Sequence, residues 1–221
     1  MIRYFTAGES HGPTLTGIIE GVPAGLEITE ADIAEHLARR QQGYGRGGRM
    51  AWEKDIARID SGVRFGKTMG GPIAMVIKNR AFEKDKAGWP MVMNKEVEAK
   101  GIEKITLPRP GHADLVGAQK YRFDDIRPVI ERSSARETGM RVACGSVARQ
   151  FLKQFGIEIG GHVLRIGAAG YTDWDQIREK TAGFMNSGAE SLYQTADTSE
   201  VRCLDDELTK QMINEMTEFY K

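Results

Sequence analysis

Cysteine, long apolar runs and net charge are all scarce in this chain of 221 residues. The two cysteines, Cys144 and Cys203, are too few for a disulfide framework and lack CxxC spacing, which fits a reducing compartment. The most apolar run, PIAMVI at 72–77, is far too short to span a bilayer, and the first residues lack the basic and apolar regions of a secretion signal. These absences predict a cytoplasmic protein with no membrane partner.

Acidic and basic residues balance, with 31 of each sign. Such a chain has no overall field that would draw it to nucleic acid or to an anionic membrane. Any binding of anions must therefore come from local clusters of basic residues. The length allows one large domain or two small ones, and we predict a single domain over residues 1–221.

Glycine, by contrast, is abundant, and its 26 residues separate many short apolar runs. Short apolar runs separated by glycines are typical of strands joined by tight turns. We predict a strand at 14–21, and a β-meander or part of a sandwich from the segments KDIARID, GVRFG and PIAMVIKN. The polar stretch 80–106 has little periodicity, so we expect a surface excursion there.

Four helices are also predicted. The first begins at Thr29, with Asp32 as its capping-box partner, and the second covers about 133–155. A short helix begins at Asp173, and an amphipathic helix with acidic residues in its first turn covers 205–221. No stop signal follows this last helix, so we expect it to continue in a longer protein.

Two histidines lie in glycine-flanked loops, His11 in GESHG and His112 in RPGHADL. Loops on a rigid scaffold often carry catalytic groups, and imidazole titrates near neutral pH, so the pair suits a general acid and a general base. We predict no metal site, since neither HxxxH nor a cysteine at ligand spacing is present. Ser10 is a poor nucleophile for His11, because side chains of adjacent residues point apart. His162, in GGHVL, is expected to be structural.

Four arginines crowd the segment RRQQGYGRGGR at 39–49, which contains no acidic residue. Guanidinium groups bind phosphate and carboxylate through paired hydrogen bonds, and glycines let the backbone approach a ligand closely. A solvated basic loop is the plain alternative. Nucleic-acid binding is a third interpretation, weakened by the zero net charge and by the lack of aromatic residues beyond Tyr44.

A second group of arginines lies in ERSSARETGMR at 131–141. Arg132 and Arg136 are four residues apart and would share a helix face, while Ser133 and Ser134 lie where that helix would begin. The N-terminus of a helix binds phosphate through free backbone N–H groups, and serine hydroxyls add donors. The alternative is a capped helix in which the two glutamates of the segment pair with the arginines.

The order and spacing of these motifs resemble those of the chorismate synthases. GESHG is followed by TLTGIIEGVPAG, RRQQGYGR, RPGHADL with QKY, and RSSARETGMRVACG, and the resemblance covers essentially the whole chain. It implies an α+β fold in which helices and antiparallel sheets form a β-α-β sandwich. It also implies a homotetramer.

The resemblance implies a lyase of the shikimate pathway, which serves aromatic amino-acid biosynthesis. Members of this family convert 5-enolpyruvylshikimate 3-phosphate to chorismate and phosphate by a 1,4-elimination that requires reduced FMN. NADPH is a candidate reductant for the flavin, although the same arginines would suit a member that depends on an external reductase. The substrate carries two carboxylates and a phosphate, which is the kind of polyanion that the arginine clusters favour.

Carried over position by position, the resemblance also implies residue roles. His11 would keep the reduced flavin correctly protonated, and His112 would assist the departure of phosphate. The expected substrate-binding residues are Ser10, Arg49 and Arg136. The expected cofactor-binding residues are Arg40 and Arg46 for NADPH, and Arg132, Ser133 and Ser134 for FMN.

Chains of this family continue well past the point that matches Lys221. The further part supplies a glycine-rich flavin segment, another arginine and an aspartate proposed to help remove the ring proton. We therefore expect the activity to belong to a longer gene product and this chain alone to turn over poorly. Two other interpretations stay open: an anion- or flavin-binding fragment without turnover, and a nucleic-acid binder that uses the segment 39–49.

Overall fold

A computed structural model describes residues 1–84, 103–184 and 186–219, and the chain divides into two compact units. Unit 1 consists of Met1–Leu37 and Glu53–Ala148, and unit 2 consists of Ala38–Trp52 and Arg149–Lys221. The single domain over residues 1–221 stays a prediction.

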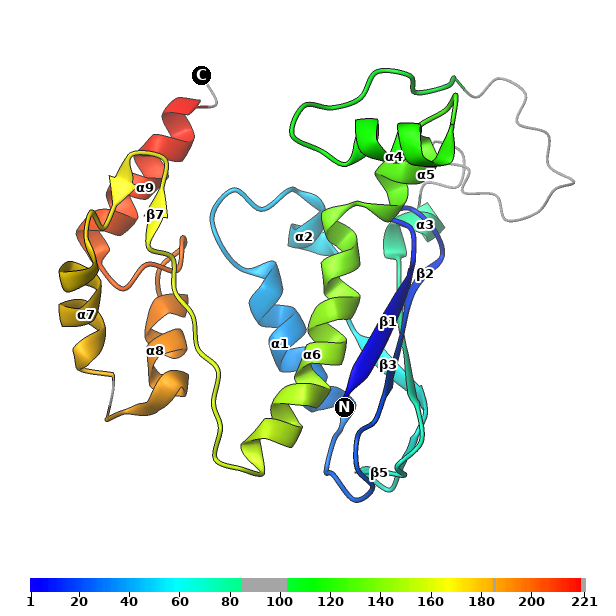
Figure 1. The fold of residues 1–221 in the computed structure, drawn as a ribbon, viewed down its shortest axis with the longest axis horizontal. Helices are drawn as coiled ribbons and strands as arrows, with labels where there is room; N and C mark the ends of the chain where they lie inside the picture. The colour runs from blue at the N-terminus through cyan, green and yellow to red at the C-terminus, as the bar shows by residue number, and fades with distance from the viewer. Residues whose placement is uncertain (85–102, 185, 220–221) are drawn as a thin grey trace, which may run out of the picture. The chain divides into compact units, whose positions relative to one another are not determined.

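A four-stranded antiparallel sheet forms the centre of unit 1, in the order β1-β2-β6-β3 (Figure 1). Its strands are β1 (Arg3–Gly8), β2 (Thr14–Glu20), β6 (Ile73–Lys78) and β3 (Ala57–Ser61). Residues of β2 and β6 alternate between buried and more exposed positions, as expected of strands with one face on a core. The hairpin of β4 (Val63–Arg64) and β5 (Lys67–Thr68) connects β3 to β6 along the chain.

Two helices, α1 (Glu30–Gln41) and α6 (Thr138–Lys153), lie on one side of this sheet in Figure 1. The predicted capping box begins α1: the Thr29 N–H donates to Asp32 Oδ2 at 2.7 Å, and the Asp32 N–H donates to Thr29 Oγ1 at 3.3 Å. Helix α6 packs closely on β2, since a Cβ on Gly17 would stand 2.5 Å from Sδ of Met140. The core contains Leu15, Ile19, Ile33, Leu37, Ile73, Met75, Ile77, Met140, Ala143 and Val147.

Short helical elements precede α6: α4 (Asp114–Tyr121), α5 (Arg127–Arg132) and the 3₁₀ helix η1 (Ala135–Glu137). The prediction of one helix over 133–155 is wrong at its beginning. Ser133 caps the C-terminal end of α5, and Ser134 adopts an extended conformation, with ψ of 147°, that interrupts the helical path. Arg132 and Arg136 therefore lie on different elements rather than on one helix face.

Unit 2 contains the helices α2 (Arg49–Trp52), α7 (Trp174–Ala182), α8 (Gly188–Asp197) and α9 (Asp206–Phe219), and the hairpin of β7 (Arg165–Ile166) and β8 (Ala169–Gly170). Asp173 caps α7, as predicted, by accepting hydrogen bonds from the backbone N–H groups of Asp175 and Gln176. A small core of Val201, Cys203 and Met212 packs against β7, β8 and the apolar face of α9.

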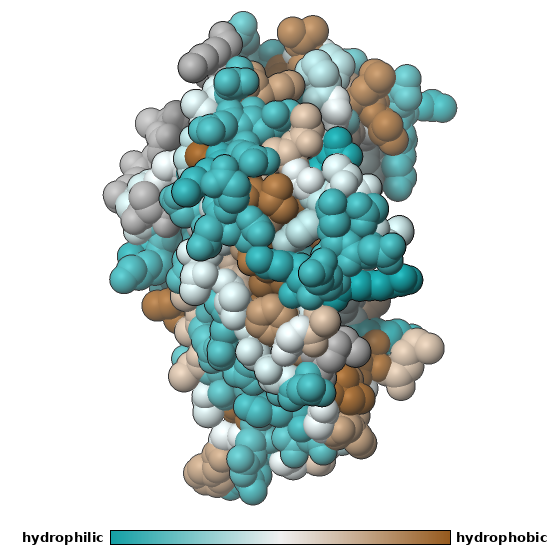
Figure 2. Space-filling view, turned by 90° about the vertical axis from the view of Figure 1, so that its left-hand side faces the viewer, coloured by the Kyte–Doolittle hydropathy of each residue, from teal (hydrophilic) through white to brown (hydrophobic). Residues whose placement is uncertain are grey.

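The α+β fold class is confirmed, and so are most of the predicted strands and helices. The sequence patterns miss β1, α2, α3, α4, α5 and α8. The surface excursion predicted at 80–106 falls mainly outside the described residues, although α3 (Arg80–Lys84) lies at its start. Hydrophilic residues cover most of the face shown in Figure 2, with apolar residues in small groups. Within 1–84, 103–184 and 186–219, no helix is long and apolar enough to cross a membrane.

Candidate active site

The GESHG segment ends β1 and forms most of the loop that leads to β2. Gly8 adopts φ of +114°, and a Cβ there would stand 2.4 Å from the carbonyl oxygen of Thr14. A Cβ on Gly12 would stand 2.6 Å from Oε2 of Glu9. Both glycines are therefore explained by the tight loop itself, which presents the three polar residues between them at one end of the sheet.

His11 is held by Glu131, a carboxylate only 1% exposed and 120 residues away in the sequence. The His11 backbone N–H donates to Oε2 at 2.8 Å, and Nδ1 of its ring lies 3.0 Å from Oε1. The Ser10 N–H donates to the Glu131 carbonyl oxygen at 3.1 Å. Because a carboxylate only accepts, Nδ1 of His11 carries a hydrogen, and this bond orients the ring.

Arg136 is 8% exposed, and its guanidinium is engaged inside unit 1. Its Nη1 donates to both carboxylate oxygens of Asp55, at 2.6 and 2.7 Å, and its Nη2 lies 3.9 Å from Oε1 of Glu53. Its Nε donates to Oδ1 of Asn79 at 2.8 Å. The predicted substrate-binding role of Arg136 stays a prediction, and these contacts give it a structural role as well.

Asn79 connects this buried arginine to the GESHG loop. Because its Oδ1 accepts from Arg136, its Nδ2 points the other way and donates to the carbonyl oxygens of Glu9 at 3.0 Å and Gly12 at 2.8 Å. Asn79 is 1% exposed, so these bonds are shielded from water. The position of the loop that carries His11 thus depends on a buried polar network.

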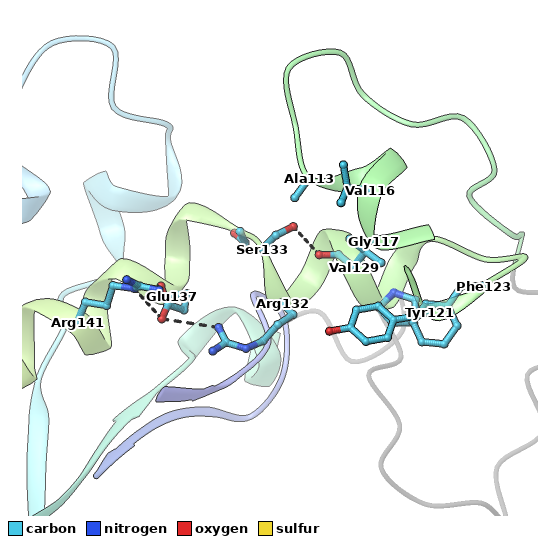
Figure 3. A pocket seen from close by; sticks show the side chains of 12 residues that line it. Ala113, Val116, Gly117, Tyr121, Phe123, Val129, Arg132, Ser133, Glu137 and Arg141 are labelled. Carbon is cyan, nitrogen blue, oxygen red and sulfur yellow. Dashed lines mark hydrogen bonds and ion pairs between the residues drawn. The ribbon is translucent and has the colours of Figure 1, made fainter. Parts of the chain in front are cut away.

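A hollow of about 510 Å³ lies beside α4, α5 and the start of α6 (Figure 3). Its polar lining includes Arg132, Ser133 and Ser134, the residues predicted to contact FMN. Ser134 Oγ also donates to Ser10 Oγ at 3.1 Å, which links this wall to the GESHG loop. The apolar lining includes Val116, Val129, Tyr121 and Phe123. The last two rings stack with centroids 5.6 Å apart.

The charged wall of this hollow is partly neutralised. Arg132 Nη2 donates to the Thr6 carbonyl oxygen at 2.8 Å, and its Nη1 lies 3.7 Å from Glu137. Glu137 also accepts from Nε of Arg141 at 2.7 Å. Burial opposes ionisation of Glu137, but hydrogen bonds from Thr6 and Arg141 outweigh it and lower the pKa of this carboxyl. Of the two glutamates in the segment 131–141, Glu137 therefore pairs with arginines, as the capped-helix alternative expects, whereas Glu131 binds His11.

His112 lies in the loop before α4, beside the fully buried Asp114 that begins this helix. Arg109 donates to Asp114 from its backbone N–H at 3.0 Å and from Nε at 2.8 Å, and these bonds hold the pKa of Asp114 well below its usual range. Nδ1 of His112 lies 3.1 Å from Oδ1 of Asp114 and 3.2 Å from Nη2 of Arg109. A neutral ring can accept there and a protonated ring can donate, so both protonation states have a partner.

The predicted site residues fall into both units. Unit 1 brings Ser10, His11, Ser134 and Arg136 into one network, and Ala113, the neighbour of His112, lines the hollow beside them. Unit 2 holds the other three predicted residues, Arg40, Arg46 and Arg49. In that segment, Nε of Arg46 donates to the carbonyl oxygen of Gln42 at 3.1 Å.

Three residues that sequence reasoning missed now belong to the candidate site: Asn79, Asp114 and Glu131. For Asp114 a signal exists in RPGHAD, where an acid follows the histidine by two residues. Asn79 and Glu131 have no such local signal, because their partners are far away in the sequence. Among the described residues, no group of three or more histidine, cysteine, aspartate or glutamate side chains is arranged to hold a metal ion.

Known proteins resemble this chain over its length. The sequence profile of the chorismate synthase family matches residues 2–221. The chain is 54% identical over 224 residues to the chorismate synthase of Salinibacter ruber, an alignment that covers 100% of this chain and 55% of that protein. It is 57% identical over 208 residues to the chorismate synthase of Chlorobaculum tepidum, covering 94% and 51% of the two chains.

A solved structure also resembles this chain. The crystal structure of a chorismate synthase matches with a TM-score of 0.72 and 38% identity, covering 98% of this chain and 53% of that one. The chain thus spans about half the length of the curated relatives it matches. On the evidence of its sequence profile, its relatives and its fold, the chain belongs to the chorismate synthase family.

Proposed function

We propose that the protein carrying this sequence converts 5-enolpyruvylshikimate 3-phosphate to chorismate and phosphate, with reduced FMN as cofactor. The observation that carries this proposal is the meeting of the GESHG loop with the RSSARE segment in unit 1. Glu131 binds the backbone N–H and ring Nδ1 of His11, and Ser134 donates to Ser10. Membership of the family supports the reaction, and this convergence supports a site in unit 1.

The hollow beside α4 and α5 suits a flavin nucleotide. Its volume of about 510 Å³ falls within the usual range for small-molecule pockets. Arg132, Ser133 and Ser134 offer a guanidinium and two hydroxyls to a phosphate, and the stacked rings of Tyr121 and Phe123 offer an apolar surface to a ring system. When bound, reduced flavin supplies electron density that stabilises the charge developing on the substrate.

The elimination breaks the bond from carbon to the phosphate oxygen and one carbon–hydrogen bond of the ring, whose proton passes to a base, and it forms a carbon–carbon double bond. Substrate and products therefore have the same overall oxidation state. His112 would give a proton from Nε2 to the departing phosphate, because Asp114 accepts from its Nδ1–H both before and after that transfer.

His11 would hold a proton at Nε2 beside the cofactor, since Glu131 fixes its other nitrogen. Ser10, Arg49 and Arg136 are proposed to bind the anionic groups of the substrate. Arg40 and Arg46 are proposed to bind NADPH as the flavin reductant. A homotetramer in the cytoplasm completes the proposal, supported by the family and by two free, buried cysteines.

The test is an anaerobic assay of the purified protein with chemically reduced FMN and 5-enolpyruvylshikimate 3-phosphate. Chorismate and phosphate are followed together, with the longest product of the same gene as control. We expect chorismate and phosphate to form in equal amounts. His112→Gln should lower kcat by about 10²- to 10⁴-fold, the usual contribution of a general acid. His36→Gln, which changes a histidine of α1, should leave kcat unchanged.

Two outcomes would contradict the proposal. Turnover that His112→Gln leaves intact would remove the role of this histidine. No product from either protein, although both bind reduced FMN, would favour the flavin-binding fragment without turnover.

A further inference from the structure

A second hollow, of about 390 Å³, lies within unit 2. None of the residues assigned to the lyase site lines it. Its basic lining comes from parts of the chain that are far apart in sequence: Arg39 of α1, Arg149 of α6 and Arg202 after α8. His162, from the GGHVL segment that the lyase proposal leaves unused, lies in the same lining.

Two of these guanidiniums, those of Arg39 and Arg202, share one carboxylate. Asp197 accepts from Nε of Arg39, and its Oδ1 lies 3.3 Å from Nε of Arg202. Arg202 Nη2 also donates to the backbone carbonyl oxygen of Arg39. Arg149 Nη1 donates to a neutral acceptor, the carbonyl oxygen of Ile159, at 2.7 Å. The described residues of this cluster therefore carry an excess of two positive charges.

Holding this cluster together costs free energy, through the repulsion between the guanidiniums and through the backbone conformation of Arg202. Burial, followed by the charge of the neighbouring Arg39, lowers the pKa of Arg202 even though Asp197 raises it. Arg202 also adopts φ of +59°, in the left-handed region that non-glycine residues seldom occupy. Strain of this kind collects at functional sites. A bound anion would relieve the repulsion between the guanidiniums.

The arginines are also held in place. The guanidiniums of Arg39 and Arg149 lie over the ring of Tyr193, at 4.8 and 5.3 Å from its centre. This contact orients both guanidinium groups before any ligand binds. The two glycines of the lining differ in the space available for a side chain. A Cβ on Gly160 would stand 2.4 Å from the carbonyl oxygen of Ala189, whereas a Cβ on Gly161 would meet nothing within 4 Å. Packing therefore does not require glycine at position 161, where its lack of a side chain keeps the lining open.

We propose that this hollow binds the phosphate monoester group of a small molecule, held by Arg39, Arg149 and Arg202, at a second anion site separate from the lyase site. A phosphate monoester carries a charge of about −1.5 to −2 near pH 7, which matches the excess of positive charge, whereas a single carboxylate would leave part of it unbalanced. Guanidinium forks also match the oxygens of phosphate in pairs.

The test uses inorganic phosphate as the probe, added to the purified protein without flavin or substrate. The reporter is the imidazole of His162, followed by NMR and assigned with His162→Gln. Burial lowers the pKa of His162, and a phosphate bound nearby should raise it. We expect the His162 signal to shift saturably with phosphate.

Variants locate the binding. Arg149→Met should weaken phosphate binding at least tenfold, and Arg149→Lys, which keeps the charge without the fork, should lie between it and the unchanged protein. Arg178→Met is the matched control, because it removes an exposed arginine of α7 that pairs only with Asp175 in the described structure. Arg132→Met, at the proposed flavin hollow, should also leave the response of His162 unchanged.

The proposal is overturned if the His162 signal does not respond to phosphate, or if Arg149→Met binds phosphate as tightly as the unchanged protein. Circular dichroism of each variant establishes that the fold is intact. Turnover does not enter this test, so the failure of the lyase proposal and the failure of this one are distinguishable.

Discussion

Replacing Asp55 with Asn tests whether the buried Arg136 organises the candidate site. The substitution keeps the shape of the side chain but removes the charge that faces Nη1 of Arg136 at 2.6 and 2.7 Å. Arg136 would keep its bond to Oδ1 of Asn79 and the more distant carboxylate of Glu53, at 3.9 Å.

The expected cost follows from this geometry. Removing one partner of a buried ion pair usually costs about 3–5 kcal/mol, because the other charge stays buried. Glu53 offsets part of the loss, so we expect a decrease of about 3 kcal/mol in the free energy of unfolding. With a urea dependence of about 1–3 kcal/mol per molar, the unfolding midpoint should fall by roughly 1–3 M.

Urea unfolding followed by circular dichroism measures this change. Asp60→Asn is the control, since Asp60 pairs with Arg58 on the surface and its loss should leave the midpoint unchanged. An Asp55→Asn protein that unfolds at the same urea concentration as the unchanged protein would show that the charge of Asp55 does not stabilise the buried Arg136.

Three further predictions concern other contacts. Glu131→Gln should lower kcat/KM about ten- to a hundredfold in the anaerobic assay, because a charge-assisted hydrogen bond to His11 contributes about 1.5–3 kcal/mol; an unchanged value would contradict this. Asp114→Asn should destabilise the protein at pH 7. Because folding lowers the pKa of Asp114 below 3.8, this stabilisation is fully present above pH 3.8 and is lost as the pH falls toward the folded-state pKa, so the difference in stability between the two proteins should shrink there. A difference in stability that does not depend on pH would contradict this prediction. Gly17→Ala should lower Tm through its clash with Met140, at a cost of about 1–3 kcal/mol, whereas Gly145→Ala, in open space on α6, should raise Tm.

Much of the fold follows from local patterns. The strand at Thr14–Glu20 alternates between the core and the outside, and the helix after Thr29 carries its own capping box, so each signal lies within a few residues. Strand β1 has no such signal, because it pairs along one edge only and its first three residues are all exposed. Helix α5, six residues long with a proline at its start, is too short for apolar periodicity to register.

The candidate site was less accessible to prediction, for a physical reason. The types of its reactive residues are visible in the motifs around His11 and His112, but their surroundings depend on contacts that the fold creates. Glu131 reaches His11 across 120 residues of sequence, and no local pattern predicts that pairing. The burial of Arg136 is equally invisible, because its partner Asp55 lies on a different segment, 81 residues away.

The most direct test of the central claim measures where reduced FMN binds. Anaerobic titration of reduced FMN should compare the unchanged protein with Arg132→Met, which alters the hollow beside α4 and α5, and with Arg178→Met on the surface of unit 2. We predict that Arg132→Met weakens the binding of reduced FMN at least tenfold, or about 1.4 kcal/mol, while Arg178→Met has no effect. Equal affinity of reduced FMN for Arg132→Met and the unchanged protein would contradict the assignment of this hollow to the flavin.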